Sequence, residues 1–329
     1  MRVVYIGGVG RSGSTLLDRM LGALPGVCAL GEVADLWGVI RLADDYCACG
    51  QSYARCDFWT EVGERAFGGW AKVDLGRVLE LRATVPRLRR VPALAGPRLG
   101  RRLQTLVDEY AAYNSAVYAA ASALTGADVV VDSSKFPAIA LCLRWAPEID
   151  LRMVHLVRDP RGVAYSWTKS VLRPESGDGQ EMPRFSPVAS ALGWDVHNVV
   201  AGLIGRSGSI MRVDGAADGR RDIPVRRVRY EQLVADPVGT VRDLCAFAGL
   251  VPAEQDLAYL TGEHVDLGAD HRIGGNPMRF RTGRLRLRRD DAWQSALPPR
   301  HRRAVTALCG PLLLRYGYPL RTRPAGSRT

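Results

Sequence analysis

The first 22 residues constrain the fold more than any other stretch of this chain. β-Branched and aromatic residues at positions 3–6 run directly into Gly7, Gly8, Gly10 and Gly13, and residues 14–21 then have helical spacing. This order predicts a strand, a glycine-rich turn and the start of a helix. The backbone N–H groups of such a turn converge on an anion and the helix N-terminus adds partial positive charge, so a phosphate site is predicted.

The turn lacks the lysine of a nucleoside triphosphatase. Gly8, Gly13 and Thr15 fit the outline G-x-x-x-x-G-K-S/T, but Ser14 occupies the lysine position and the basic residue is Arg11, inside the turn. That lysine lies between the terminal phosphates, so its absence counts against hydrolysis of ATP or GTP. A turn that serves only tight packing is the alternative, and the arginine and hydroxyls disfavour it.

The composition is that of a globular chain with an anion-attracting field. The chain has 329 residues, 47% of them hydrophobic and 24% charged, which allows one large core over residues 1–320 and a short flexible tail over 321–329. The formal charge is +11, yet only three of the 45 basic residues are lysines. Because an arginine bias of this kind can reflect a GC-rich genome, we predict anionic substrates and no nucleic-acid binding.

The sequence predicts a cytoplasmic protein. It contains no uninterrupted run of about 18 apolar residues, and the first strand begins at residue 3, which leaves no room for a secretory signal. Seven cysteines are an odd number for a disulfide framework, so most are expected to be thiols.

The second predicted strand, residues 27–30, ends at Gly31 and Glu32. This position lies on the same edge of an open α/β sheet as the phosphate turn, where ligands bind, so Glu32 is a candidate general base. An ordinary solvated or helix-capping glutamate is an equally simple interpretation.

Three cysteines lie close together in the sequence, at Cys47, Cys49 and Cys56. They could bind Zn²⁺ with a distant fourth ligand, or two of them could pair. The C-x-C spacing is unusual for zinc and no histidine is near in sequence, so a folded turn that carries thiols is the simpler interpretation.

Residues 44–127 predict a mostly helical insertion with an arginine-rich middle. Residues 103–124 have helical periodicity around three tyrosines, Tyr110, Tyr113 and Tyr118. The insertion could form a lid or wall for an acceptor substrate. Its basic stretch could instead touch a membrane surface peripherally, although most such stretches are solvated faces.

Three further strands are predicted at 128–135, 151–157 and 225–228. Asp132 stands where a triphosphatase would hold Mg²⁺, which keeps a P-loop kinase as an alternative. Lys135 could place an ammonium near a transferring group, although a plain turn capped by a serine is the competing interpretation. His155 is predicted to be a core histidine.

A second anion site is predicted after the strand at 151–157. Asp159 suits a helix N-cap and Pro160 the first helical position, so Arg158 stands at the edge of the sheet, with Ser166 farther along the helix. An arginine and a hydroxyl in this arrangement can bind an anion, whereas pairing of Arg158 with Asp159 is the alternative. Residues 170–187 predict a mobile loop over the cleft.

A glycine-rich basic segment near the C-terminus is a weaker candidate for nucleotide contacts. Its backbone N–H groups and arginines could wrap a nucleotide, although basic surface loops are common. The segment comprises Ile273, Gly274, Gly275, Asn276, Pro277, Met278, Arg279, Phe280, Arg281 and Thr282.

Together, these blocks resemble the sulfotransferases that use 3′-phosphoadenosine 5′-phosphosulfate. One block looks like the 5′-phosphosulfate loop of that family, and residues 156–161 with Ser166 look like its 3′-phosphate motif. The first block comprises Gly10, Arg11, Ser12, Gly13, Ser14, Thr15 and Leu16. The resemblance implies an α/β fold of three layers, P-loop-like, with a central, mostly parallel sheet flanked by helices, plus the helical insertion.

The resemblance also implies roles for individual residues. Glu32 would deprotonate the acceptor hydroxyl, as in the protein-tyrosine sulfotransferases and related bacterial enzymes, and Lys135 would assist the leaving group. Arg158 and Ser166 would fix the 3′-phosphate, and Tyr230 would lie by the adenine. The 5′-phosphosulfate loop would hold the phosphosulfate, and the segment 273–282 would close over the nucleotide. No metal is expected in the transfer.

The chain departs from the protein-tyrosine enzymes at Ser170, where they have a further arginine, and it shows no secretory signal. The sequence therefore predicts a bacterial-type sulfotransferase that acts on a hydroxyl of a small-molecule, glycan or lipid-linked acceptor. The alternatives are the kinase and a non-catalytic nucleotide- or polyanion-binding module. The oligomeric state is not predicted.

Overall fold

A five-stranded sheet organises the chain, in which every pair of neighbouring strands is parallel. The computed structural model describes residues 1–42, 45–172, 181–210 and 222–321. The spatial order of the strands is β2-β3-β1-β4-β5. The strands are β1 (Arg2–Gly8), β2 (Val27–Ala29), β3 (Val129–Lys135), β4 (Asp150–Val157) and β5 (Val225–Arg229). All five coincide with predicted strands, so the predicted α/β class with a parallel sheet is confirmed.

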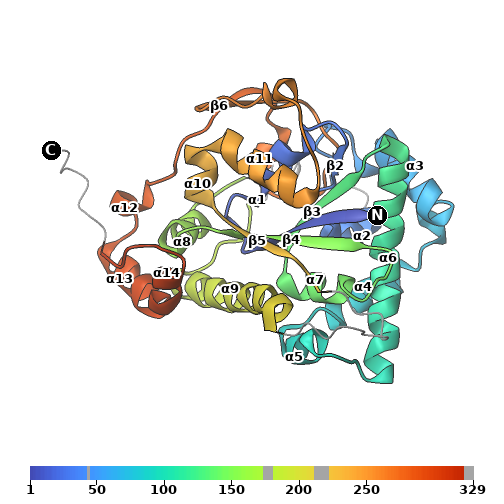
Figure 1. Ribbon diagram of the computed structural model, residues 1–329, viewed down its shortest axis with the longest axis horizontal. Coiled ribbons are helices and arrows are strands. Elements are labelled where there is room, and N and C mark those ends of the chain that lie inside the picture. Colours follow the sequence, from blue (N-terminus) through green and yellow to red (C-terminus); the bar gives the residue numbers. More distant parts are fainter. Residues whose placement is uncertain (43–44, 173–180, 211–221, 322–329) are drawn as a thin grey trace.

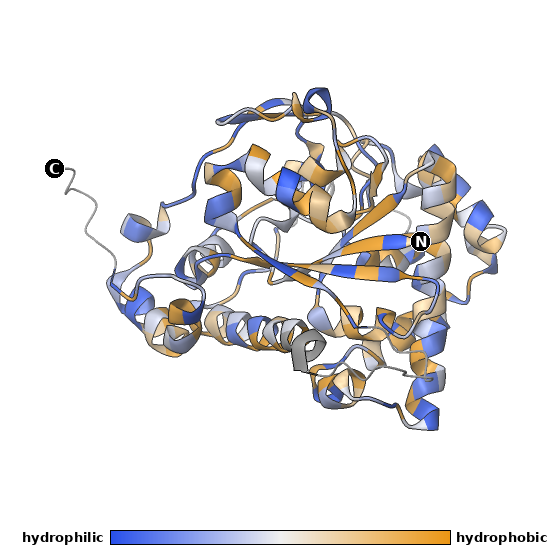
Figure 2. Cartoon of the chain, in the orientation of Figure 1, coloured by the Kyte–Doolittle hydropathy of each residue, from blue (hydrophilic) through white to orange (hydrophobic). Residues whose placement is uncertain are grey.

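The sheet is the middle layer of three because its central strand is apolar on both faces. In β1, Val3 and Tyr5 belong to one hydrophobic core, whereas Val4 and Ile6 belong to a second core on the other face. Figure 2 shows the hydrophobic residues concentrated along the strands. Helices α1 (Ser14–Gly22), α10 (Tyr230–Ala235) and α11 (Pro237–Ala248) cover one face (Figure 1).

The other face is covered by the short helix α7 (Pro137–Leu143) and the long helix α9 (Pro187–Ile210), among others (Figure 1). Four helices gather beside α9 at one end of the sheet, and two hairpin strands lie beyond α1. The former are α8 (Pro160–Thr168), α12 (Trp293–Ala296), α13 (Pro299–Leu308) and α14 (Gly310–Arg315), and the latter are β6 (His264–Leu267) and β7 (Gly283–Arg286).

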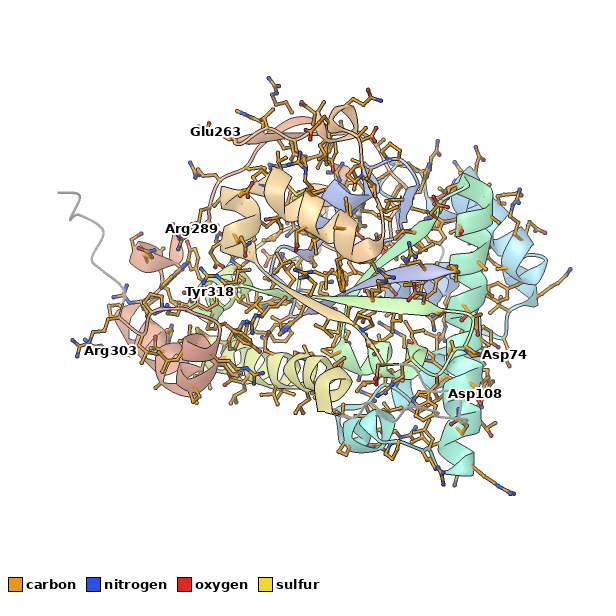
Figure 3. The ribbon with its side chains drawn as sticks, viewed as in Figure 1. Asp74, Asp108, Glu263, Arg289, Arg303 and Tyr318 are labelled. Carbon is orange, nitrogen blue, oxygen red and sulfur yellow. The ribbon has the colours of Figure 1, made fainter. Side chains whose placement is uncertain are left out.

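The described part of the region between β2 and β3 is mostly helical. Its longest helix, α6 (Arg101–Thr125), includes the predicted helix at 103–124, and buried Tyr110 and Tyr118 join the same core as Val3. Figure 3 shows Asp74 and Asp108 at this side of the molecule, away from Arg289 and Tyr318. The other helices are α2 (Val33–Leu42), α3 (Asp57–Phe67), α4 (Leu75–Thr84) and α5 (Val91–Ala95), with 3₁₀ turns η1 (Tyr53–Arg55), η2 (Trp70–Lys72) and η3 (Leu88–Arg90).

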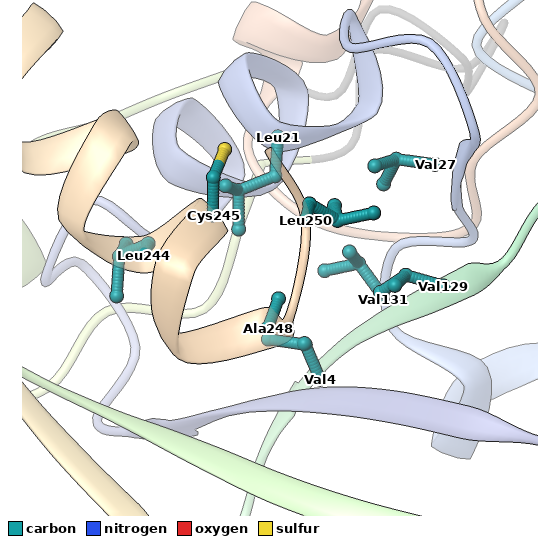
Figure 4. Close-up of a pocket in the computed structure, with 9 residues that line it drawn as sticks. All are labelled: Val4, Leu21, Val27, Val129, Val131, Leu244, Cys245, Ala248 and Leu250. Atoms are coloured by element: carbon teal, nitrogen blue, oxygen red, sulfur yellow. The ribbon is translucent and has the colours of Figure 1, made fainter. Parts of the chain in front are cut away.

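A small gap beneath α11 belongs to the core and not to a ligand site. Its lining is apolar and comes from β1, β2, β3, α1, α11 and the residues after α11 (Figure 4), so it offers no group that could orient a polar ligand. The lining residues are Val4, Leu21, Val27, Val129, Val131, Leu244, Cys245, Ala248 and Leu250.

The sequence also predicts a helix near residues 255–260, and this prediction is wrong, because the segment forms only a short 3₁₀ turn, η4 (Glu254–Leu257). The β6–β7 hairpin was not predicted. Among the helices of the described residues, none is both long and apolar enough to cross a bilayer. The middle of the predicted loop at 170–187 and residues 322–329 of the predicted tail lie outside the described residues.

Candidate active site

The turn after β1 has the geometry of an anion cradle. Gly13, the N-cap of α1, has φ 94°, and its left-handed backbone turns the first N–H groups of the helix into the turn. A Cβ on Gly13 would lie 2.6 Å from the Tyr230 ring, so only glycine fits. Ser12 Oγ and Arg11 Nε are buried and have no hydrogen-bond partner among the described residues. Buried polar atoms of this kind fit an anionic ligand.

Arg158 connects the two predicted anion sites. Its Nη1 donates to the carbonyl oxygen of Arg11 at 2.9 Å, and its guanidinium lies 4.6 Å from the centre of the Tyr230 ring. The indole of Trp194 donates to the Arg158 carbonyl oxygen at 3.0 Å, which fixes the backbone behind the guanidinium. The residues predicted for the 5′- and 3′-ends of a donor therefore lie side by side at the carboxyl ends of β1 and β4.

The alternative in which Arg158 pairs with Asp159 is wrong. The Asp159 carboxylate caps α8 through the N–H of Arg161 at 2.9 Å and pairs with the Arg161 side chain at 2.7 Å. Arg158 pairs instead with Asp290, 3.0 Å away. Ser166 is half-buried farther along α8.

Glu32 is neither solvated nor an ordinary cap, because its carboxylate forms an ion pair with Lys135. The two side chains come from the ends of the adjacent strands β2 and β3, and each is only 15% exposed. Burial raises the pKa of Glu32 above its ordinary value, and the positive charge of Lys135 opposes this rise without cancelling it. The result is a carboxylate of increased basicity.

Backbone geometry sets two of the predicted cations apart. Among the described residues, Arg11 with φ 69° and Lys135 with φ 70° are the two non-glycine residues with a positive φ. This conformation costs free energy for residues with a Cβ and persists where the surrounding structure enforces it, which is common at functional sites.

The segment 273–282 lies over Thr15 and Glu32. Its first residue pairs with Gly31, and the N–H of Asn276 donates to Thr15 Oγ1 at 3.2 Å. At Gly275, φ is 91° and a Cβ would lie 3.3 Å from Glu32 Oε1, so the backbone approaches the carboxylate directly. Its middle forms the 3₁₀ turn η5 (Pro277–Phe280).

The arginines of this segment point in different directions. Arg279 is 2% exposed and donates to the carbonyl oxygen of Tyr46 at 3.2 Å, while Arg281 is exposed. The structure thus brings the start of the segment to the phosphate turn and turns Arg279 toward residues 45–46.

Asp132 does not have the environment of a Mg²⁺ ligand. Its carboxylate is 1% exposed and accepts hydrogen bonds from the Tyr118 hydroxyl at 2.5 Å and from the Ser134 N–H at 2.7 Å. Burial raises the pKa of Asp132 to about 6. Ser134 does not cap α7 but accepts from the N–H of Ala34 at the start of α2. These contacts connect α6, β3 and α2 and leave the carboxylate facing the protein interior.

Two histidines, His155 and His197, have nearby hydrogen-bond partners. His155 is 2% exposed, its Nε2 lies 2.8 Å from Asn198 Oδ1, and burial lowers its pKa to about 4. His197 Nδ1 lies 2.7 Å from the carbonyl oxygen of Gly193, one turn earlier in α9. The prediction of a core histidine at 155 is confirmed.

Sequence reasoning missed the neighbours that position the predicted residues. Trp167 lies under the Arg11 guanidinium at 4.8 Å, and Asp290 holds Arg158. Neither had a sequence signal, because the first is one of several aromatic residues on a helix and the second lies in a loop more than a hundred residues from its partner.

Comparison with known proteins gives a consistent family assignment. The sequence model of a family described as "Sulfotransferase family" matches residues 4–254. Carbohydrate sulfotransferase 5 of Mus musculus is 31% identical over 177 residues, and carbohydrate sulfotransferase 6 of Homo sapiens is 30% identical over 184 residues. Each alignment covers 52% of this chain but only 42% of the relative, so the chain spans about two fifths of the length of these relatives.

Two solved sulfotransferase domains align with most of the chain at low sequence identity. The domain from the Synechococcus PCC 7002 olefin synthase has a TM-score of 0.46 at 18% identity and covers 98% of this chain and 96% of that chain. The domain from the curacin biosynthetic pathway has a TM-score of 0.49 at 16% identity and covers 97% of this chain and 98% of that chain.

Proposed function

Because the chain belongs to the sulfotransferase family, we propose that it transfers a sulfuryl group from 3′-phosphoadenosine 5′-phosphosulfate to a hydroxyl of its acceptor. The observation that carries this proposal is the convergence of Arg11, Glu32 and Lys135 at the ends of adjacent strands, with both cations held at positive φ. Sulfuryl transfer depends on positioning and on positive charge around the transferring group, which this arrangement supplies.

The donor fits the residues of the phosphate turn. When bound, the donor would supply the sulfuryl group that is transferred. The buried, unpartnered Ser12 Oγ and Arg11 Nε would hydrogen-bond the 5′-phosphosulfate, together with the first N–H groups of α1 and the Thr15 hydroxyl. Arg158 and Ser166 would hold the 3′-phosphate, and Tyr230 would pack against the adenine, because its ring already lies on Gly13.

Glu32 would take the proton of the acceptor hydroxyl. Its raised pKa suits a base, and Lys135 keeps a useful fraction of the carboxylate ionised. Lys135 would also place positive charge near the leaving oxygen. The segment 273–282 would exclude water from this position, because it already lies over Thr15 and Glu32.

The proposed acceptor is a hydroxyl compound. The names of the curated relatives favour a carbohydrate hydroxyl as the first acceptor to test, with other glycans, small molecules and lipid-linked acceptors next. The helical region 45–127 would form a wall of the acceptor site. A peripheral membrane contact through its arginines and a cytoplasmic location stay predictions.

The two rival functions have a direct test. Ligand binding raises the thermal midpoint by mass action, so 3′,5′-adenosine bisphosphate without Mg²⁺ should stabilise the protein. A shift that requires Mg·ATP would favour the kinase, which the buried, satisfied Asp132 disfavours. Binding of the bisphosphate with no transfer to any acceptor would favour the binding module.

Substitution of the base tests the mechanism. Glu32→Gln keeps the size of the side chain but cannot accept the proton, so the transfer rate should fall by ~10²–10⁴ while bisphosphate binding is retained. Asp35→Asn is the matched control and should retain most activity. Asp35 is a carboxylate three residues after Glu32, and it pairs with Arg82. Transfer of labelled sulfate measures both. Unchanged turnover in Glu32→Gln would remove Glu32 from the mechanism.

A further inference from the structure

Three cysteines and a histidine from distant parts of the chain meet outside the proposed active site. The Sγ atoms of Cys47, Cys49 and Cys56 and the Nδ1 atom of His271 all lie within 4.8 Å of one another. The sequence showed the three cysteines and no nearby histidine. The fourth residue, His271, lies 215 positions after Cys56 in the sequence. It supplies the distant fourth ligand that the three cysteines would need.

Three of the distances within the cluster are close to those of a tetrahedral metal site. Cys56 Sγ and Cys47 Sγ lie 3.3 Å and 3.8 Å from His271 Nδ1, and the sulfurs of Cys49 and Cys56 lie 3.8 Å apart. Four ligands at ordinary Zn–S and Zn–N lengths are separated by about 3.5–3.8 Å around a tetrahedral ion. The separations are too long for a disulfide, whose sulfurs lie about 2.05 Å apart.

We propose that Cys47, Cys49, Cys56 and His271 bind one structural Zn²⁺. Thiolates and an imidazole are the ligands that zinc prefers, and binding releases the three thiol protons to solvent. Four protein ligands close the coordination sphere, so this ion offers no position to a substrate. The site is therefore separate from the sulfuryl transfer, for which no metal is expected.

The surroundings hold the ligands in place. Cys47 and Gly50 close a tight turn, in which the Gly50 N–H donates to the Cys47 carbonyl oxygen at 2.9 Å. Cys56 is the N-cap of α3. The His271 ring stacks on Phe58 with 5.0 Å between centroids and 11° between planes, which fixes the direction of Nδ1. Cys47 and Cys56 are buried, whereas His271 is exposed and leaves a path for the ion.

The metal would join the helical region 45–127 to the segment over the active site. His271 is two residues before Ile273, whose backbone pairs with Gly31 beside Glu32. The Tyr53 hydroxyl donates to the Arg272 carbonyl oxygen at 3.0 Å in the same connection. Loss of zinc should therefore loosen residues 271–276 and weaken nucleotide binding. The weaker nucleotide binding is the only expectation here that rests on the proposed function, because the metal content of the protein does not depend on that function.

Metal analysis of the purified full chain tests the site. We expect about one zinc per chain in the wild-type protein, and a loss of at least about tenfold in Cys56→Ser and in His271→Ala. Cys245→Ser, a buried cysteine in α11, is the matched control and should keep its zinc.

A second measurement covers variants that fail to fold. Zinc is removed from the wild-type protein with a chelator, and Co²⁺ is added. An intense thiolate-to-cobalt absorption band and a raised thermal midpoint with added Zn²⁺ are expected. Protein without zinc that shows neither the band nor the shift would overturn the proposal, as would a Cys49–Cys56 disulfide in the peptide map of the protein as purified.

Discussion

Arg11 lies in the turn before α1 and Arg19 in the last turn of α1, and both are largely removed from water, yet their guanidinium groups are satisfied very differently. All three guanidinium nitrogens of Arg19 donate: Nε to Asp270 at 3.1 Å, Nη1 to the carbonyl oxygen of Met278 at 2.8 Å and Nη2 to that of Gly268 at 2.8 Å. Within the described part of the chain, the Arg11 side chain makes one hydrogen bond, from Nη2 to the sulfur of Met182, and its buried Nε has no partner there.

The difference separates an arginine that holds the fold from one that is available to a ligand. A buried charge without matched partners is costly, so complete pairing at Arg19 indicates a structural role. Incomplete pairing at Arg11, together with a positive φ, indicates a site prepared for an anion. Substitution of a structural arginine should therefore lower stability, whereas substitution of a ligand-binding arginine should weaken nucleotide binding.

The largest effect is expected at Arg19. Arg19→Met keeps much of the buried volume but removes the hydrogen bonds that the Arg19 side chain donates to Gly268, Asp270, Met278 and Arg281, so the free energy of unfolding should fall by about 3–5 kcal/mol. Urea denaturation measures this loss. Affinities for 3′,5′-adenosine bisphosphate and for 5′-AMP should change by the same factor at a temperature where the variant is folded. A loss of affinity for the bisphosphate without a matching loss for 5′-AMP would instead place Arg19 in the binding site.

Arg158 should show the opposite pattern. Arg158→Ala removes the proposed partner of the 3′-phosphate, and a charge-assisted hydrogen bond of about 1.5–3 kcal/mol corresponds to roughly 10–150-fold weaker binding of the bisphosphate. Binding of 5′-AMP, which lacks the 3′-phosphate, should change little. Titration calorimetry with both ligands gives the ratio, and equal weakening would mean that Arg158 is structural.

Sequence patterns predicted the sheet and the phosphate turn because both depend on local order. The strand at 3–6, the glycines after it and the Asp159–Pro160 helix start are signals contained within a few residues. The pairing of Arg19 with Asp270 and of Arg158 with Asp290 joins residues more than a hundred positions apart. Such contacts depend on tertiary packing, which single-sequence periodicity does not report.

A substitution of Lys135 tests whether this residue sets the pKa of Glu32. The positive charge of Lys135 lowers the pKa of Glu32 against the effect of burial. In Lys135→Met the positive charge is lost, so the pKa of Glu32 rises further. Because the base must be ionised to act, activity is then lost at a higher pH as the solution is acidified. The acid limb of the kcat/KM profile should therefore move upward. A uniform loss of rate with an unmoved limb would limit Lys135 to the leaving group.

The smallest effect is expected at Asp290, and its sign is the informative part. Asp290 holds Arg158 at 3.0 Å and lies 3.6 Å from Lys169, and these cations keep the pKa of Asp290 below its ordinary value despite burial, so it is ionised at neutral pH. A bound 3′-phosphate would compete with this carboxylate for Arg158 and would be repelled by it. Asp290→Asn should therefore bind the bisphosphate a few-fold more tightly, by about 1 kcal/mol or less, with 5′-AMP unchanged. Removal of a structural partner such as Asp270 should never tighten binding, so weaker binding in Asp290→Asn would place Arg158 in the same structural class as Arg19.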